Sequence, residues 1–439
     1  MLDLKLLAAN PVALQTALAK KGFQLAPDAI LALAAQQKAT LQKIEKLRQT
    51  QNLASKALTQ ISDQTQKNTK IAELKTVAQE LKDLTTQFQQ TKKTLNAQLL
   101  TIPNPPLPDV PAGGENDFEI LRHVGSIPEF NFAPRDHVIL MTKLGLLNLE
   151  RGVQLSGSRF YYLLGAAVQL EFALVNFVLQ KLTAHGFLPT IGPTLVREAA
   201  LVATGFFPAE REQIYAVNPT TATNPKGDDL FLIGTSEVSL AMLHAQEILT
   251  TPLPRRYLGF STCYRREAGS YGKDTKGIFR VHQFDKLEMF TYTEPEKSAA
   301  EHEFLLECQE EILQDLGLPY RVVKIAARDL GLPAAKKYDL EVYLPSEKKY
   351  RELTSCSNCT DFQARRAQIR FTKNSQKEFV HTLNGTALAV SRALIALVEN
   401  YQNADYSVTI PKVLRPFLGM EILKPKNNPC VATMCSDNS

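Results

Sequence analysis

The sequence predicts an α+β protein that carries an antiparallel α-helical coiled-coil arm at its N-terminus. Three observations lead to this fold class. Apolar residues recur at steps of three and four through most of the first hundred residues. Five prolines follow within residues 103–111, a density that ends any helix. Beyond them, patterns typical of strands and of amphipathic helices are interleaved.

Two long helices form the predicted arm. A short amphipathic region over residues 2–18 and a breaker at Gly22 come first, and the first long helical pattern then starts near Pro27. It carries Ile30, Leu33, Leu41 and Ile44 on its apolar face, and a second pattern covers residues 71–95. Residues 62–70 contain no apolar side chain and predict the turn between them. Helices of about thirty residues make a hairpin on the order of 45 Å long.

Length and composition set the domain organisation. The chain has 439 residues, of which 44% are hydrophobic, so it has room for two or three domains with a sizeable core. We expect an arm over residues 1–101, a proline-rich linker over 102–125, a folded body over 126–425 and a polar, disordered tail over 426–439.

Charge and cysteine usage narrow the class of protein. Residues 1–100 hold 14 Lys and Arg against 7 Asp and Glu, and the remainder is nearly balanced at 36 against 38. A basic arm favours a polyanionic partner, although a solvated lysine-rich helix explains the charge equally well. The N-terminus lacks a basic leader and no stretch of about eighteen apolar residues occurs, which predicts a cytoplasmic protein without a membrane segment. Six dispersed cysteines indicate free thiols rather than a disulfide framework or a zinc site.

The body is predicted to alternate helices and strands. Helical patterns cover residues 159–186, 237–249 and 295–316. Strand patterns cover residues 187–196, 214–217, 230–233, 257–264, 278–281, 321–325, 337–344 and 350–354.

The hairpin around residues 263–288 carries the densest set of functional side chains. Alternation along its second strand places Arg280, His282, Phe284, Lys286 and Glu288 on one face. An arginine and an aromatic ring at this spacing suit the phosphate and the base of a nucleotide. On the partner strand, Arg265 and Glu267 form a second same-face pair. Taken alone, however, such a strand is more often a salt-bridged surface.

Three further clusters each allow a functional and a structural interpretation. Thr235 and Glu237 lie where a strand ends and a helix starts, so they are either ligand-binding residues or helix caps. Glu352 and Ser355 offer oxygen ligands of the kind that hold magnesium, a weak signal alone. Arg392 lies in an almost fully apolar helical run, where a buried arginine requires an anionic partner.

Together these clusters resemble the seryl-tRNA synthetases of bacterial type, which are class II aminoacyl-tRNA synthetases. The resemblance rests on GTSE at 234–237, the arginine-bearing hairpin with its exit VHQFDKLE, YRELTSCSNC at 350–359 and HTLNGTALAVSR at 381–392. It extends from residue 1 to about residue 425. It implies a mixed, mainly antiparallel catalytic sheet flanked by helices in residues 126–425, with the arm binding tRNA.

The resemblance also implies an activity. L-serine and ATP would form seryl-adenylate, and the seryl group would pass to tRNA(Ser), and to tRNA(Sec) where present. The implied catalytic residues are Arg265, Arg280 and Arg392. The implied ATP contacts are Arg265, Arg266, Glu267, Arg280, Phe284, Glu352, Leu353, Thr354, Ser355 and Arg392. The implied L-serine contacts are Thr235, Ser236, Glu237, Arg265, Glu288, Asn384 and Thr386.

The resemblance also implies roles for individual residues. Phe284 and Arg392 would enclose the adenine, and Glu352 with Ser355 would hold Mg²⁺. Thr235 and Glu237 would meet the ammonium of serine, and Glu288 its hydroxyl. A homodimer is implied as well, with residues 159–196 at its interface.

Two departures from the family pattern and two rival interpretations stay open. Arg266 stands where serine is common, and Ser391 where glycine is usual. A catalytically inert paralogue that binds RNA through its coiled coil is the alternative outside the enzyme class. Synthetases for threonine or proline give no reason for the N-terminal arm.

Overall fold

The structure is a computed structural model that describes residues 2–250, 252–269 and 276–425. The expected tail over 426–439 and Gly272 of the hairpin connection lie outside these ranges. Contacts divide the chain into two compact units, Met1–Pro105 and Pro106–Ser439. Each unit is described by itself.

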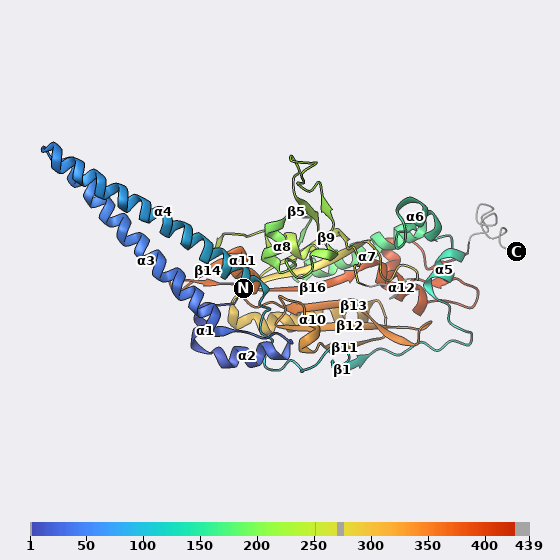
Figure 1. The fold of residues 1–439 in the computed structure, drawn as a ribbon. Coiled ribbons are helices and arrows are strands. Elements are labelled where there is room, and N and C mark those ends of the chain that lie inside the picture. The colour runs from blue at the N-terminus through green and yellow to red at the C-terminus, as the bar shows by residue number, and fades with distance from the viewer. Residues whose placement is uncertain (1, 251, 270–275, 426–439) are drawn as a thin grey trace. The chain divides into compact units, whose positions relative to one another are not determined.

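The first unit is helical and contains the predicted coiled coil. Its helices are α1 (Leu4–Ala9), α2 (Pro11–Lys20), α3 (Pro27–Leu58) and α4 (Gln64–Thr101). The long helices α3 and α4 run side by side as a hairpin (Figure 1). A cluster of buried leucines and isoleucines at the base of the hairpin joins α1 and α2 to it.

Two details of the arm differ from the sequence prediction. The turn is shorter than residues 62–70, because Asp63 accepts a hydrogen bond from the Gln66 amide at 2.8 Å and so starts α4 at Gln64. Leu41 is 39% exposed, whereas Thr40 is buried. Thr40, and not Leu41, continues the regular three-and-four spacing from Leu33 to Ile44. The contact face between the two long helices therefore follows the heptad positions, even where the residue there is polar.

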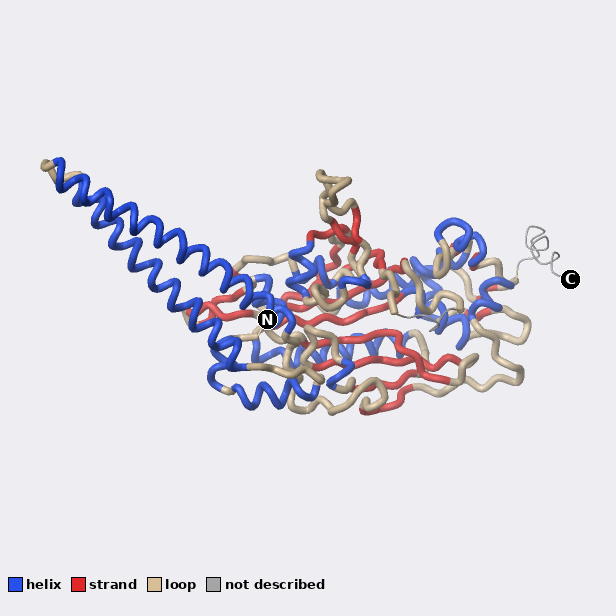
Figure 2. The backbone as a smooth tube through the Cα atoms, in the orientation of Figure 1, coloured by secondary structure: helices blue, strands red, loops and turns tan. Residues whose placement is uncertain are grey.

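The second unit is built on an eight-stranded sheet with the order β1-β11-β12-β13-β16-β10-β9-β4. Its strands are β1 (Glu119–Val124), β4 (Leu188–Thr190), β9 (Arg255–Tyr264), β10 (Gln283–Thr293), β11 (Tyr320–Lys324), β12 (Lys336–Leu344), β13 (Lys349–Asn358) and β16 (His381–Ala389). All neighbouring strands are antiparallel except β4 and β9, which are parallel. The predicted α+β class with a mixed, mainly antiparallel sheet is confirmed (Figure 2).

Shorter elements complete the second unit. The helices are α5 (His137–Lys143), α6 (Leu149–Ser156), α7 (Ala166–Ala184), α8 (Glu198–Thr204), α9 (Glu237–Ala241), α10 (Ser298–Asp315), α11 (Phe362–Ala367), α12 (Val390–Asn400) and α13 (Arg415–Leu418). The remaining strands are β2 (Leu147–Asn148), β3 (Tyr162–Leu163), β5 (Leu195–Arg197), β6 (Ala216–Val217), β7 (Leu230–Leu232), β8 (Ile248–Leu249), β14 (Arg370–Lys373), β15 (Gln376–Phe379), β17 (Val408–Thr409) and β18 (Ile422–Leu423).

The two faces of the sheet have different environments. Leu287 and Met289 of β10 belong to the main core, to which α7, α10 and α12 also contribute. Phe290 and Tyr292 alternate with them along the strand and pack instead with α9 and α11. Lys286 and Glu288 share the face of Phe290, so this face carries the polar side chains as well.

Four predicted elements differ from the structure. The helix expected over residues 159–186 starts only at Ala166, after strand β3. Residues 237–249 do not form one helix, since α9 ends at Ala241 and Ile248 pairs in β8. Residues 187–196 form two short strands, β4 and β5, because Pro193 has no amide hydrogen to continue a ladder. Residues 278–281 are not a strand, because the Ile278 amide donates to His137 Nε2 at 3.2 Å instead of to a neighbouring strand.

Candidate active site

A cavity of about 310 Å³ lies on the polar face of the sheet, over β10, β13 and β16. It gathers residues that are far apart in the sequence. Of the predicted site residues, those that line it are Thr235, Glu237, Arg265, Glu267, Arg280, Phe284, Glu288, Glu352, Leu353, Ser355, Asn384, Thr386 and Arg392. The interpretation of the hairpin as an ordinary charged surface is therefore wrong.

Two β-bulges direct these side chains into the cavity. Glu352 and Ser355 are three residues apart, so a regular strand would point them to opposite faces. Between them the register of β12 and β13 shifts by one residue, which leaves Leu353 without a partner. A second shift between β10 and β16 leaves Ala387 unpaired, so that Thr386 and Ala389 both face the cavity.

One end of the cavity is a buried polar cluster. Lys286 Nζ lies 2.7 Å from Thr235 Oγ1 and 2.7 Å from Glu288 Oε2. Thr386 Oγ1 also donates to Glu288 Oε2, at 3.3 Å. These contacts cross from the loop before α9 to β10 and β16, and they fix the Glu288 carboxylate between two donors.

Glu237 lies at the same end, at the start of α9. Its Oε1 accepts hydrogen bonds from Gln363 at 2.7 Å and from Asn384 at 3.0 Å. Burial and the nearby charge of Glu288 raise the pKa of the Glu237 carboxyl to about 7, although Gln363 and Lys286 act in the opposite direction. This carboxyl therefore gains or loses its proton near neutral pH.

Arginines and one aromatic ring line another part of the cavity. The Arg265 side chain donates to the Gly234 carbonyl oxygen at 3.2 Å, and its guanidinium carbon lies 5.4 Å from the centre of the Phe284 ring. Arg280 Nε lies 3.0 Å from Glu267 Oε2. Each cation is thus held in place by contacts within the protein.

Arg392 and Glu352 form the third part of the cavity. Arg392 Nη1 donates to the Glu352 carbonyl oxygen at 2.9 Å and lies 3.3 Å from Oε2. Burial alone raises the pKa of Glu352, but the charges of Arg392, Lys337 and Arg265 outweigh it and lower that pKa to about 2. Glu352 is therefore a carboxylate at any working pH.

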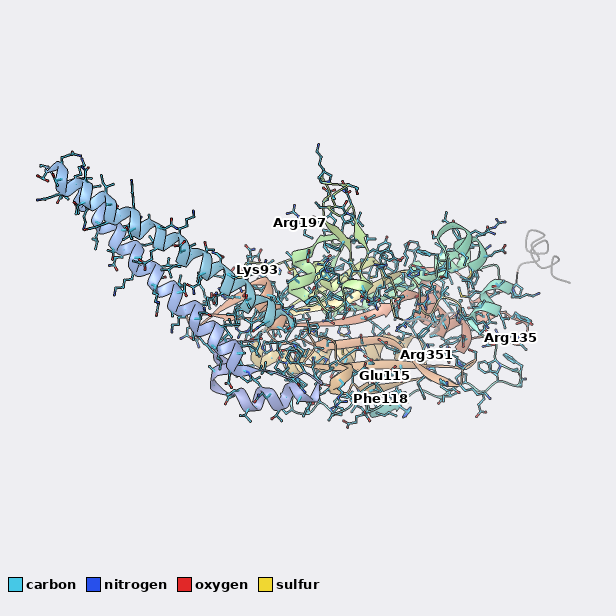
Figure 3. The ribbon with its side chains drawn as sticks, in the orientation of Figure 1. Lys93, Glu115, Phe118, Arg135, Arg197 and Arg351 are labelled. Atoms are coloured by element: carbon cyan, nitrogen blue, oxygen red, sulfur yellow. The ribbon has the colours of Figure 1, made fainter. Side chains whose placement is uncertain are left out.

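Arg392 stacks on an aromatic ring that had no predicted role. Its guanidinium carbon lies 4.6 Å from the centre of the Phe279 ring. Arg351 of β13, labelled in Figure 3, contacts the same ring at 4.1 Å. Phe279 is thus held by two guanidinium groups, while Phe284 is covered by Arg265.

Three predicted site residues do not line the cavity. Ser236 is buried, and its hydroxyl donates to the Gly259 carbonyl oxygen at 3.5 Å. Thr354 is buried on the other face of β13. Arg266 is exposed, and its backbone amide donates to the Gln213 carbonyl oxygen at 2.8 Å.

The cavity also contains three charged residues whose role was not predicted, namely Lys286, Lys337 and Glu210. Lys286 alternates with Phe284 and Glu288, so its face was predictable and only its role was missed. Lys337 Nζ lies 3.0 Å from Asp339 Oδ1 on β12. Glu210 comes from the segment after α8, where no sequence signal marked it. Ser391, the second departure from the family pattern, lies in the wall as well.

Family models match two parts of the chain. The seryl-tRNA synthetase N-terminal domain matches residues 1–106, and the tRNA synthetase class II core domain (G, H, P, S and T) matches residues 215–401. A curated relative, the serine–tRNA ligase of Leifsonia xyli subsp. xyli, is 46% identical over 433 residues, which make up 97% of this chain and 99% of that protein. The chain belongs to the seryl-tRNA synthetase family.

Solved structures agree with this assignment. The seryl-tRNA synthetase from Pyrococcus horikoshii, solved with ATP, has a TM-score of 0.87 and 38% identity, and the match covers 97% of this chain and 100% of that one. The cytoplasmic serine–tRNA ligase from Naegleria fowleri, solved with AMP, has a TM-score of 0.84 and 34% identity, with 97% and 99% covered. This synthetase is accordingly a class II aminoacyl-tRNA synthetase, as its motifs indicated.

Proposed function

We propose that this synthetase attaches L-serine to tRNA(Ser), and to tRNA(Sec) where present, through a seryl-adenylate formed from ATP. One observation carries the proposal: a single cavity has arginines on one wall and a buried pair of carboxyls, Glu237 and Glu288, at its other end. The first wall suits a polyphosphate, and the second suits an amino acid with a hydroxyl side chain.

In the first step a carboxylate oxygen of serine attacks the α-phosphorus of ATP. A phosphorus–oxygen bond forms, the bond to the β-phosphate oxygen breaks, and pyrophosphate leaves. The protein needs no nucleophile for this reaction, so its contribution is positioning and neutralisation of charge. Arg265, between the two ends of the cavity, contacts the α-phosphate and the serine carboxylate, and Arg280 and Arg392 neutralise the outer phosphates.

In the second step a ribose hydroxyl at the 3′ end of tRNA attacks the seryl carbonyl, and AMP leaves. The pairs that arginines form in this structure must open for the nucleotide. Arg280 has to exchange Glu267 for phosphate, and Arg265 has to leave the Phe284 ring if adenine stacks there. Glu267 then orients the adenine or the ribose.

Glu237 and Glu288 are the proposed acceptors in the serine subsite. Glu237, with Thr235 beside it, accepts the ammonium, and Glu288, with Thr386 and Asn384 nearby, accepts the hydroxyl. A site that binds a hydroxyl through a buried carboxylate rejects alanine, which would leave that carboxylate unpaired.

Mg²⁺ fits the donor set at the other wall. Burial raises the pKa of Glu352, but nearby cations outweigh this effect and lower the pKa to about 2, so the residue is ionised. Ser355 presents a hydroxyl to the same cavity. These two residues would hold the ion, and the ion would supply positive charge to neutralise the phosphates of ATP. Glu352 has to turn from Arg392 to do so.

The proposed partners are tRNA and a second copy of the chain. The arm carries exposed basic residues on both long helices, among them Lys38, Lys43, Lys46, Arg48, Lys56, Lys75 and Lys82. A homodimer through residues 159–196 is supported by the exposure of Phe172, Leu188 and Ile191, which reaches 84% at Ile191. Within the described ranges no helix is long and apolar enough to cross a membrane.

Serine-dependent exchange of pyrophosphate into ATP tests the proposal. We expect exchange with L-serine, none with L-alanine, and transfer of serine to tRNA(Ser) in a separate assay. Exchange that depended on threonine or proline would contradict the substrate. Absence of exchange with any amino acid, together with retained tRNA binding, would favour the inert paralogue.

A further inference from the structure

Lys286 is buried among the residues of the proposed serine subsite. Its side chain is 7% exposed and that of Glu288 is 3% exposed. Among the described residues, its two polar contacts are to this subsite, with Thr235 Oγ1 and Glu288 Oε2 each at 2.7 Å. A buried ammonium that bridges two ligand-binding groups controls what those groups can still bind.

The contacts of Lys286 determine which carboxylate oxygen of Glu288 faces a ligand. In the described part of the chain, both polar contacts of that carboxylate are to Oε2, from Lys286 and from Thr386. Oε1 is left to accept a hydrogen bond from a bound molecule. The charge of Lys286 also offsets the cost of burying this carboxylate.

Lys286 restricts Thr235 in the same way. Thr235 Oγ1 accepts from Lys286 Nζ at 2.7 Å and from the Glu237 amide at 3.2 Å. A hydroxyl oxygen has two lone pairs, so both are used and its hydrogen remains to be donated. Thr235 therefore meets a ligand as a donor, and the ammonium of serine is left to Glu237.

The charge of Glu237 also depends on this lysine. Burial and Glu288 raise its pKa to about 7, while Gln363 and Lys286 hold it down. Loss of Lys286 thus moves the pKa of Glu237 further up. The titratable or charged residues around Glu237 are Lys286 and Glu288 on β10, Glu210 after α8, Arg265 after β9 and Cys359 after β13.

We propose that Lys286 is a positioning residue of the serine subsite, which orients Glu288 and Thr235 and keeps Glu237 able to accept the ammonium of the amino acid. The inference rests on the proposed function and adds to it. A positioning role differs from a purely structural one, because a structural ion pair would affect stability without changing how serine affinity depends on pH.

The experiment compares Lys286→Met, Lys286→Gln and Lys286→Arg in the full-length protein. Serine KM, ATP KM and kcat are measured by ATP–pyrophosphate exchange from pH 5.5 to 8.5. The matched control is Lys324→Met, because Lys324 is 14% exposed and pairs with Glu119 at 2.7 Å outside the cavity. Thermal unfolding is followed for all four variants.

In the wild type we expect serine KM to rise as the pH falls below about 7, where Glu237 takes up a proton. In Lys286→Met and Lys286→Gln the rise begins at higher pH, and serine KM at pH 7 increases roughly 10- to 100-fold, the effect of a lost hydrogen bond to a charged group. ATP KM should change by less than about threefold, much less than serine KM. Lys286→Arg keeps the charge and the wild-type pH dependence, and Lys324→Met changes unfolding only.

Two results would overturn the inference. One is a serine KM in Lys286→Gln that equals the wild-type value. The other is an increase by the same factor at every pH, which a structural role explains. Failure of the proposed function looks different, since the wild type itself would then show no serine-dependent exchange.

Discussion

Arg392 holds Glu352 by its backbone and by its side chain. The Nη1 atom donates to the carbonyl oxygen at 2.9 Å and lies 3.3 Å from Oε2 of the carboxylate. The proposed phosphate-binding cation and the proposed metal ligand thus neutralise each other. In the proposed complex a phosphate of ATP would be the new partner of Arg392, and Mg²⁺ would be the new partner of Glu352.

This pairing predicts the effect of Glu352→Gln. Because the pKa of Glu352 is lowered to about 2, the residue is charged throughout the range in which the enzyme can be assayed, and the substitution removes that charge at every pH. We expect the Mg²⁺ concentration for half-maximal exchange to rise about tenfold, by the same factor at pH 6.5 and pH 8.5. Magnesium titration of the exchange rate measures it.

The control for this variant is Glu341→Gln. Glu341 pairs with Arg321 at 2.5 Å on the neighbouring strands and does not line the cavity. Its substitution should leave the magnesium requirement unchanged. An unchanged requirement in Glu352→Gln as well would mean that Glu352 only orients Arg392.

Glu288→Ala is predicted to separate serine binding from ATP binding. The substitution removes the acceptor of the serine hydroxyl and leaves the Lys286 ammonium without its carboxylate. We expect kcat/KM for serine to fall roughly 100-fold or more, as for a lost charged hydrogen bond in a buried site. ATP affinity, measured by equilibrium binding without serine, should change little, since the arginine wall is intact. Equal losses of both would contradict the assignment.

The sequence predicted the site better than it predicted the local backbone. Motif positions identified half of the residues that line the cavity, because each motif joins a recognisable strand or helix to a polar end. They did not reveal the register shift near Leu353, which turns Glu352 and Ser355 to the same face, or the shift near Ala387, which does the same for Thr386 and Ala389. A bulge depends on the partner strand, and no local pattern specifies it.

The segment after the hairpin connection shows a second limit of local patterns. Residues 278–281 alternate like a strand, yet the Ile278 amide finds its partner in His137, more than a hundred residues earlier. His137 is held in turn by Glu399, whose Oε1 lies 3.2 Å from its Nδ1. A hydrogen-bond partner so distant in sequence overrides the local preference.

Gly277→Ala is predicted to disturb the cavity through this contact. Gly277 has φ +72°, and a Cβ atom there would lie 2.0 Å from His137 Nε2. The nearby Phe279 and Arg280 would have to shift, so we expect ATP KM to rise about tenfold, equivalent to about 1.4 kcal/mol. Gly269→Ala is the matched control, since Gly269 has φ +78° but no atom of the described residues lies within 4 Å of the added carbon. Backbone strain alone would affect both variants equally, and equal ATP KM values would contradict a specific role of the His137 contact.

The basic surface of the arm gives the last prediction, that neutralising four of its lysines weakens tRNA binding without affecting adenylate formation. The four are exposed lysines on α3 and α4: Lys43, Lys46, Lys75 and Lys82. If they bind phosphates, replacing them with glutamine should lower the slope of log affinity against log salt by roughly 0.7 to 0.9 for each phosphate that is no longer neutralised. Serine-dependent exchange should stay at the wild-type rate, because the cavity residues belong to the second unit.

The matched variant replaces four exposed lysines of that unit with glutamine: Lys348, Lys349, Lys377 and Lys412. Filter binding to tRNA(Ser) is measured at several salt concentrations between about 50 and 300 mM. The slopes of the two lysine variants are then compared. Equal slopes for both variants would show that net charge, and not the arm, governs the affinity.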